Sequence, residues 1–380
     1  MQPCLENSRS FFEKLQSAPG LDLRDVRGRR HNLAVILTGV TLAVLSCRDG
    51  TLSSIRRHMA SHYGRLVAFL EVRDVPSQAV SRAQLPRVLE KVSAEVFDRL
   101  IFSSFGVRLT PEQKQWFAID GKELRGSIAA GAKRGEAVVR AVAHKNQQCA
   151  GQNYYSGDKE SEIPTVRELV KNTKLGGQKL SFDALHCQFE TLELVVAGGG
   201  KYLVGVKNNQ PELFELMKKV SAEQTCLWKI SEQGRGHGRR EEREYEFYDL
   251  LEIPKNKKWE NCRLRTLVKV TRIREEVKSG RLSREESYYV TNETGNYEEL
   301  GEAIRNHWRV ETDNYVRDVT FKEDALQTGQ KTLSRVMAGV RTLGLEVLKR
   351  IGCHNKKAQM EEFADNFEIS LGFLQKLDFL

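Results

Sequence analysis

The sequence offers little that could form a disulfide framework or a structural zinc site. Its seven cysteines are scattered along 380 residues, and no two of them have the Cys-X-X-Cys spacing. Their odd number also argues against a fully paired set of disulfides. This cysteine usage excludes the small disulfide-stapled folds and predicts a protein of the reducing cytoplasm.

Long apolar segments are also scarce. The longest runs from Leu33 to Cys47 and is interrupted by Thr38, Gly39 and Thr41. It is too short to span a bilayer, so we expect a buried helix and no membrane partner. Residues 1–10 lack the apolar core of a signal peptide. No internal repeat or low-complexity tract is visible, and the length suits two or three globular domains.

The charge balance is basic. The chain has 60 Lys and Arg against 51 Asp and Glu, which gives a net charge of +9, and its pI is about 9.1. Such a balance favours a polyanionic partner such as nucleic acid, although it says nothing about the fold. The plainer interpretation is a basic soluble enzyme, and charge alone leaves both interpretations open.

Three acidic residues stand at the ends of ordered-looking segments. Asp120 follows the apolar run 116–119, Asp183 follows the short apolar stretch 180–182, and Glu311 closes a helix-like segment, Asn306–Glu311. Three carboxylates that converge can hold two divalent metal ions. In a basic protein, such a pair of ions indicates phosphoryl transfer on nucleic acid.

The segments around these acids resemble a known family. AIDGKELRGS, SFDALHCQ, VGVKNNQPEL, GHGRREER and HWRVET…RDVTFKEDA are similar to the signature blocks of ISAs-type, or H repeat-associated, insertion-sequence transposases, which are bacterial DDE enzymes. The resemblance covers residues 21 to about 350. DLRDVRGRRH near the N-terminus resembles the start of that family's associated N-terminal domain. The AIDGK and HWxxE blocks together are specific, whereas either alone is weak.

The resemblance implies a fold and an activity. It implies a ribonuclease H-like core in which Asp120, Asp183 and Glu311 are the catalytic and metal-binding residues. Two Mg²⁺ ions, replaceable by Mn²⁺, would serve cleavage of the element ends and transfer of the 3′-hydroxyls into target DNA. One ion activates the nucleophile and the other stabilises the leaving oxygen, about 3.5–4 Å apart. The resemblance also implies a cytoplasmic protein that acts on DNA as a homodimer or larger assembly.

Each of the three acids also has a plain structural explanation. Asp120 precedes Gly121, a common turn pair. Asp183 could cap the helix that follows it, and Glu311 could be an exposed helix residue paired with Arg305. Taken singly, these explanations are the better ones, but matching blocks around all three acids favour the catalytic interpretation.

The predicted fold class is α/β, with a mixed sheet, flanking helices, a β-rich insertion and an N-terminal helical domain. Residues 1–110 are predicted to be helical and to bind DNA, 111–208 and 300–380 to form the two parts of the core with C-terminal helices, and 209–299 to form the insertion. The predicted core strands are WFAID, 137–144, 153–156, 179–183 and 202–206. The predicted core helices are 163–170, with a proline in the first turn, and 188–197.

Beyond the core, the predicted strands are 244–250, 264–273 and 287–291, and the predicted helices are 297 to beyond 311, and 332–350. A polar, arginine-rich loop is predicted at 234–243. A basic cluster at 24–30 either contacts phosphates or is a solvated helix start.

Further residues are candidates for DNA contact because they flank the acids or lie in the insertion: Lys122, Arg125, Lys207, Asn208, Gln210, His237, Arg239, His307 and Trp308. The alternatives are ordinary polar loops and, for Trp308, core packing. His58 and His62 share a helix face and could bind a metal, but no metalloprotease glutamate lies between them, so packing is favoured.

The segment after Glu311 departs from the family pattern. Asp318 follows Glu311 by seven residues, where the family has eight, so no role is transferred to residues 312–318. We expect Asp318, Glu323 and Asp324 to brace the helix rather than to bind metal. Two other functions remain open: an inactive DNA-binding regulator derived from a transposase, and a metal-dependent nuclease without strand transfer.

Overall fold

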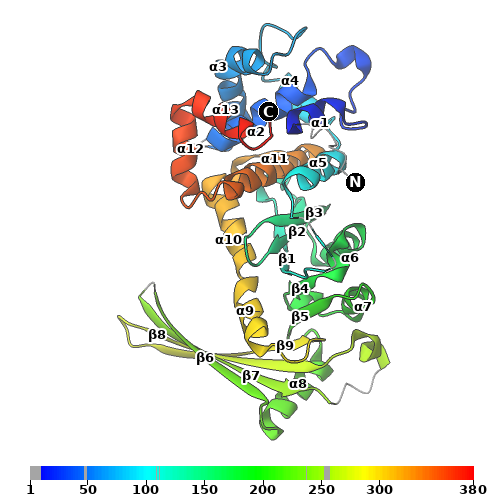
Figure 1. The fold of residues 1–380 in the computed structure, drawn as a ribbon, viewed down its shortest axis with the longest axis vertical. Helices are drawn as coiled ribbons and strands as arrows, with labels where there is room; N and C mark the ends of the chain where they lie inside the picture. Colours follow the sequence, from blue (N-terminus) through cyan, green and yellow to red (C-terminus); the bar gives the residue numbers. More distant parts are fainter. Residues whose placement is uncertain (1–9, 47–48, 108, 111, 237, 252–256) are drawn as a thin grey trace, which may run out of the picture.

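The computed structural model describes residues 10–380 except 47–48, 108, 111, 237 and 252–256. The molecule is elongated, with a helical bundle at one end, a sheet in the middle and a β arm at the other end (Figure 1). No helix within these described ranges is long and apolar enough to cross a membrane.

The bundle is built from both ends of the chain. Figure 1 shows the N-terminal and C-terminal helices lying together, and they share one hydrophobic core. Every residue of the second helix is buried, which confirms the prediction for the apolar segment that begins at Leu33. The helices are α1 (Phe11–Ser17), α2 (Leu33–Ser46), α3 (Leu52–Phe69), α4 (Gln84–Leu89), α5 (Ala94–Phe105), α11 (Lys331–Arg350), α12 (Lys356–Asp365) and α13 (Phe367–Gln375).

One continuous sheet runs through the rest of the described chain, in the order β3-β2-β1-β4-β5-β9-β8-β7-β6. Its first half forms an antiparallel meander of β1, β2 and β3 and a parallel group of β1, β4 and β5. The strands predicted for the core are confirmed, with small shifts in their ends: β1 (Trp116–Glu123), β2 (Ala137–Ala143), β3 (Cys149–Tyr155), β4 (Lys179–Phe182) and β5 (Lys201–Val206).

Helices cover both faces of this half of the sheet (Figure 1). On one face, α6 (Lys159–Asn172) and α7 (Phe189–Ala197) bury Phe117 and Ile119 of β1. On the other, α9 (Tyr297–His307) and α10 (Arg309–Tyr315) pack over Ala118, which contacts Val310. Side chains alternate along a strand, so Asp120 points to the same side as Ala118, toward α10.

The second half of the sheet extends as an arm made of β6 (Trp228–Gly236), β7 (Arg239–Asp249), β8 (Thr266–Glu276) and β9 (Leu282–Thr291). The predicted loop at 234–243 is therefore wrong, because 234–236 and 239–243 are paired strand residues at the end of the β6–β7 hairpin. Both faces of the hairpin end are exposed, so no apolar alternation marks the strands. Ion pairs between neighbouring strands take the place of apolar packing, among them Arg274–Glu241 at 2.8 Å and Lys229–Glu244 at 2.7 Å.

Three boundaries also differ from the sequence prediction. α6 begins at Lys159, so Pro164 lies inside the helix rather than in its first turn. The predicted insertion opens with a helix, α8 (Pro211–Glu223). The helix expected to run past Glu311 breaks at Trp308 and continues after α10 as a π-helical turn, Val316–Thr320.

A buried ionic network fixes α10 against α11. Asp313 of α10 accepts from Arg317 Nε at 2.9 Å and from Lys349 Nζ at 2.7 Å, and both Asp313 and Arg317 are essentially inaccessible to solvent. Burial alone would raise the pKa of Asp313, but Lys349 and Arg317 hold it well below its usual range. Lys349 also forms an ion pair with Glu346 at 3.0 Å. The network thus joins three elements: α10, the π-helical turn that carries Arg317, and α11.

Replacing Asp313 by asparagine tests this network. We expect Asp313→Asn to lower the free energy of unfolding by about 3–5 kcal/mol, because Arg317 and Lys349 lose their shared counter-ion. In the wild type, the share that depends on the depressed pKa is present above the ordinary value of 3.8 and is lost as the pH falls below it.

The measurement is urea denaturation at pH 7, with Asp318→Asn as the matched control. Asp318 also forms an ion pair, with Lys122, but 41% of its side chain is exposed, so its loss should cost less than about 1 kcal/mol. Equal effects of the two substitutions would contradict the network's role.

Candidate active site

The pairing of β1 with β4 places two acids side by side. The parallel register pairs Ile119 with Phe182, so Asp120 and Asp183 each stand one residue beyond this pair. Asp120 is not part of a turn, because β1 continues to Glu123 through its pairing with β2. Asp183 does act as an N-cap, since its Oδ1 accepts from Leu185 N at 3.0 Å. The cap and a functional role are compatible, because the second carboxylate oxygen has no part in this bond.

The electrostatic environment of Asp120 is unfavourable to its charge. Burial, then the carboxylates of Asp183 and Glu162, raise the pKa of Asp120 to about 7. Asn314 Nδ2 of α10 donates to Asp120 Oδ2 at 3.2 Å. A carboxyl group with so high a pKa, beside a second acid, is typical of a functional site.

Glu311 lies on the same helix as Asn314, three residues earlier, and therefore shares its face. It lines one pocket with Asp120 and Asp183, so the structure brings all three predicted acids to one place. Burial raises the pKa of Glu311, with no contribution from the two aspartates. Glu311 thus lines the pocket but is not a close neighbour of Asp120 and Asp183.

A hydrogen-bonded chain anchors the end of α9 beside this pocket. Ser181 Oγ lies 2.9 Å from His144 Nε2 and 2.9 Å from His307 Nδ1. Burial lowers the pKa of His144 to about 3 and that of His307 to about 4, so both rings are neutral at pH 7. A hydroxyl has one proton, so one ring donates to Ser181 and the other accepts from it.

A second polar cluster lies behind Asp120, on α6. Glu162 accepts a hydrogen bond from the Tyr155 hydroxyl at 2.7 Å, and His186 Nε2 lies 3.2 Å from its other oxygen. Gly121 makes room for it: a Cβ there would stand 2.5 Å from Glu162 Cδ and 2.6 Å from the Tyr155 oxygen. The glycine after Asp120 therefore lets Glu162 and Tyr155 pack closely against β1, and it does not form a turn.

The donor set suits a hard divalent cation only in part. Asp120 and Asp183 offer carboxylate oxygens, which Mg²⁺ prefers, and a bound cation would relieve the repulsion that raises the pKa of Asp120. However, no three acidic, histidine or cysteine side chains are close enough to form a metal site within the described ranges. The two aspartates fit a cation, and Glu311 can join them only if α10 or its side chain moves.

The residues predicted to contact DNA fall into three groups. Lys207 and Trp308 line the pocket of the three acids, as does His307; Arg125, Asn208 and Arg239 are exposed elsewhere. Two are engaged within the protein: Lys122 pairs with Asp318 and Glu323, and Gln210 donates to the carbonyl of Cys187. His237 lies outside the described residues.

The acids in the π-helical turn and just after it brace the structure, as expected. Asp318 and Glu323 hold Lys122 at 2.6 and 2.9 Å, and Asp324 Oδ1 accepts from the backbone N–H of Arg125 at 3.1 Å. His58 and His62 also pack as expected, since His62 stacks on Phe367 with ring centroids 4.2 Å apart.

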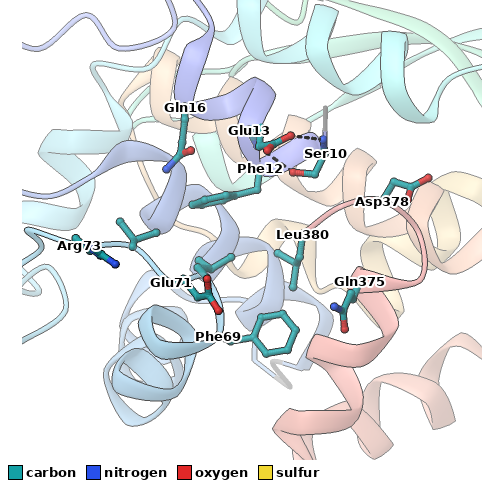
Figure 2. Close-up of a pocket in the computed structure, with 12 residues that line it drawn as sticks. Ser10, Phe12, Glu13, Gln16, Phe69, Glu71, Arg73, Gln375, Asp378 and Leu380 are labelled. Carbon is teal, nitrogen blue, oxygen red and sulfur yellow. Dashed lines mark hydrogen bonds between the residues drawn. The ribbon is translucent and has the colours of Figure 1, made fainter. Parts of the chain in front are cut away.

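Another pocket, of about 680 Å³, lies in the helical bundle (Figure 2). Figure 2 shows Glu13, Glu71 and Asp378 around it, and Glu13 is tied to Ser10 in a capping box. With these acids and one arginine, Arg73, its lining repels phosphate. It is also remote from the paired aspartates, so it is the weaker candidate for the functional site.

Three residues of the site escaped sequence analysis. Ser181 precedes Asp183 by two residues and Asn314 follows Glu311 by three, so strand alternation and the helical period could have placed both on the correct faces. Glu162 carries no such signal, because its approach to Asp120 depends on how α6 packs on the sheet.

The pKa of Asp120 makes a prediction about stability. The Asp120 carboxyl group has a pKa near 3.8 in the unfolded chain and about 7 in the folded chain. The folded state therefore loses stability relative to the unfolded state as the pH rises from 4 to about 7, because Asp120 is harder to ionise in the folded state. We expect Asp120→Asn to raise the free energy of unfolding by roughly 2 kcal/mol at pH 8 and to change it little at pH 4.

Urea denaturation at both pH values measures this difference. Asp74→Asn, at an exposed position, is the control and should behave alike at the two pH values. A destabilised Asp120→Asn variant at pH 8 would show that the carboxylate is not under repulsion.

Known proteins are similar to this sequence over most of its length. The chain is 26% identical to the H repeat-associated putative transposase YhhI of Escherichia coli K12 over 355 residues, which is 90% of each chain. It is 25% identical to the putative transposase YncI of Escherichia coli O157:H7 over 278 residues, or 70% of each chain.

A third relative matches a shorter part of the chain at a higher sequence identity. The H repeat-associated putative transposase YbfD of Escherichia coli K12 is 32% identical over 139 residues, which is 35% of this chain and 54% of that protein. No protein-family model matches the chain. The relatives agree with the resemblance of the acid-bearing blocks, and the chain is similar over most of its length to H repeat-associated putative transposases.

Proposed function

We propose that this protein is a transposase of the DDE type, which cuts the DNA at the ends of an insertion element and joins the freed 3′-hydroxyls to target DNA. The observation that carries the proposal is the adjacency of Asp120 and Asp183 at the edge of β1 and β4, with Glu311 in the same pocket. A pair of Mg²⁺ ions, replaceable by Mn²⁺, would be held there.

We further propose that β1 to β5 form a ribonuclease H-like core. The support is the order β3-β2-β1-β4-β5, in which an antiparallel meander joins a parallel group. Helices α6 and α7 lie between the parallel strands in sequence. The acids then stand at the carboxyl ends of parallel strands, where open sheets usually bind their ligands.

When bound, divalent cations at such carboxylates supply Lewis-acid stabilisation of the charge on phosphoryl oxygens. The protein's own part is to hold and orient. Asp120 and Asp183 would bind the cations, and Asn314 fixes the orientation of the Asp120 carboxylate. Ser181 engages His307 Nδ1, which leaves Nε2 as the ring nitrogen able to meet a substrate oxygen.

Binding of DNA would rest on the basic and polar residues near this pocket. Lys207 is exposed at its rim, where its ammonium can reach a phosphate. The net charge of +9 adds a general attraction to DNA that weakens with salt. A dimer or larger assembly would be needed to hold two element ends at once.

The proposal predicts metal-dependent cuts at defined positions. We expect purified protein with Mg²⁺ or Mn²⁺ to nick a plasmid that carries the gene's own flanking DNA at discrete sites, leaving 3′-hydroxyl ends. Asp120→Asn should reduce nicking at least about a thousandfold, since it removes a charge that binds the metal. Mapping the 3′ ends and searching for their joints to a second DNA measures both steps.

Asp318→Asn is the matched control, because it changes an acid near the site that braces Lys122 and does not line the pocket. It should keep nicking. Specific binding without nicks under either metal would instead identify an inactive regulator, and nicks scattered at random, without joints, would identify a nuclease that lacks strand transfer.

A further inference from the structure

The pocket beside the acids continues into a notch at the edge of the sheet. β5 pairs with β9 only as far as Val206 and Tyr288, whereas β9 begins at Leu282 and is paired beyond this point with β8 alone. Within the described part of the chain, β9 therefore has no strand partner on the β5 side at Glu285–Ser287, and an edge of this kind offers backbone N–H and C=O groups. This edge faces the pocket, since these residues line it.

Aromatic side chains form much of the notch wall. They come from α8, from β9 and from the junction of α9 with α10: Phe214, Tyr288, Tyr289 and Trp308. Phe214 and Tyr288 meet edge to face at 5.5 Å, which holds both rings in place. Such a wall has no evident part in binding a cation or a phosphate, so the three acids do not explain it.

Trp308 stands at the rim of this wall. It lies at the break between α9 and α10, and 45% of its surface is exposed. Arg272 lies over its ring at 5.9 Å, so a planar group could be held between or beside them. An exposed aromatic ring at the rim of a pocket offers a face on which a nucleobase can stack.

The charges on the arm side of the notch are balanced within the protein. Glu285 pairs with Arg272 at 3.5 Å, and Glu286 pairs with Lys269 and Arg284 at 3.5 and 3.0 Å. The notch therefore combines an apolar wall, backbone donors and acceptors, and little net charge. This is the chemistry that suits a flat, uncharged ring with polar edges.

The size of the pocket limits what can enter. Its volume is about 340 Å³, near the lower end of pockets that hold small molecules, about 300–1,000 Å³. A duplex cannot enter a pocket of this size, but a single unstacked nucleotide can. Enzymes that do chemistry on a base turn its nucleotide out of the stack into a pocket of this kind.

We propose that this notch receives one nucleobase, turned out of the duplex next to the phosphate that is cut, with Trp308 stacking on its face. The inference rests on the proposed function, because it concerns the DNA whose cleavage the three acids would serve. Unstacking would draw the scissile phosphate away from the duplex axis and toward Asp120 and Asp183, which line the same pocket.

The test combines a change in the protein with removal of a base. Duplexes that span a mapped nick are made intact or with a single abasic site at each position near it, and nicking rates are measured. We expect Trp308→Ala to slow nicking of intact DNA about tenfold or more, and Trp308→Phe to retain most of the rate. At one position, removal of the base should slow nicking by the wild-type protein about as much as Trp308→Ala slows nicking of intact DNA. Removal of the same base should leave the nicking rate of Trp308→Ala unchanged.

Trp228→Ala is the matched control. Trp228 is as exposed as Trp308, at 46%, but it stacks on Tyr297 near the base of the arm and does not line the pocket. It should nick intact DNA at the wild-type rate.

The outcomes separate the two proposals. Multiplicative effects of Trp308→Ala and base removal at every position, or normal nicking by Trp308→Ala, would overturn the base pocket while leaving the DNA-cutting function intact. A wild-type protein that makes no metal-dependent nicks in any duplex would overturn the proposed function, and the base pocket with it.

Discussion

The parallel pairing of β1 with β4 is the constraint on which the rest of the site depends. Its backbone hydrogen bonds end beside Ile119 and Phe182, whose side chains are buried under α6 and α7. The burial of these apolar residues offsets the repulsion between Asp120 and Asp183 immediately beyond them. A shift of one residue in this register would turn one of the two acids to the opposite face.

The second determinant is the orientation of α10. This short helix carries Glu311 and Asn314 toward the pocket and Asp313 toward the interior, where Arg317 and Lys349 bind it. Buried charges contribute little net stability compared with well-packed apolar residues, but they have strict geometric needs. The ion pairs of Asp313 can form only when α10 is in one orientation about its axis. In that orientation, Glu311 and Asn314 face the edge of the sheet.

The β arm follows a different principle from the core. Near its base, Tyr245 and Phe247 pack under α9, and the strands have an ordinary buried face. Toward the tips, both faces are exposed and oppositely charged residues pair across the strands. The notch beside the acids lies between the base of the arm, which has a buried apolar face, and the exposed part of the arm. For this reason aromatic side chains lie beside solvent there.

The sequence by itself determined the elements whose apolar patterns are local: the buried helix α2, the core strands, and the placement of Asp120 and Asp183 at the ends of apolar runs. It could not reveal that 234–236 and 239–243 are strand residues, because ion pairs between strands leave no apolar period within one strand. Nor could it bring Asn314 to Asp120 or Glu162 behind it, since 194 residues separate the first pair. Strand register, helix packing and the rotation of α10 depend on contacts between distant segments, and only the tertiary structure decided them.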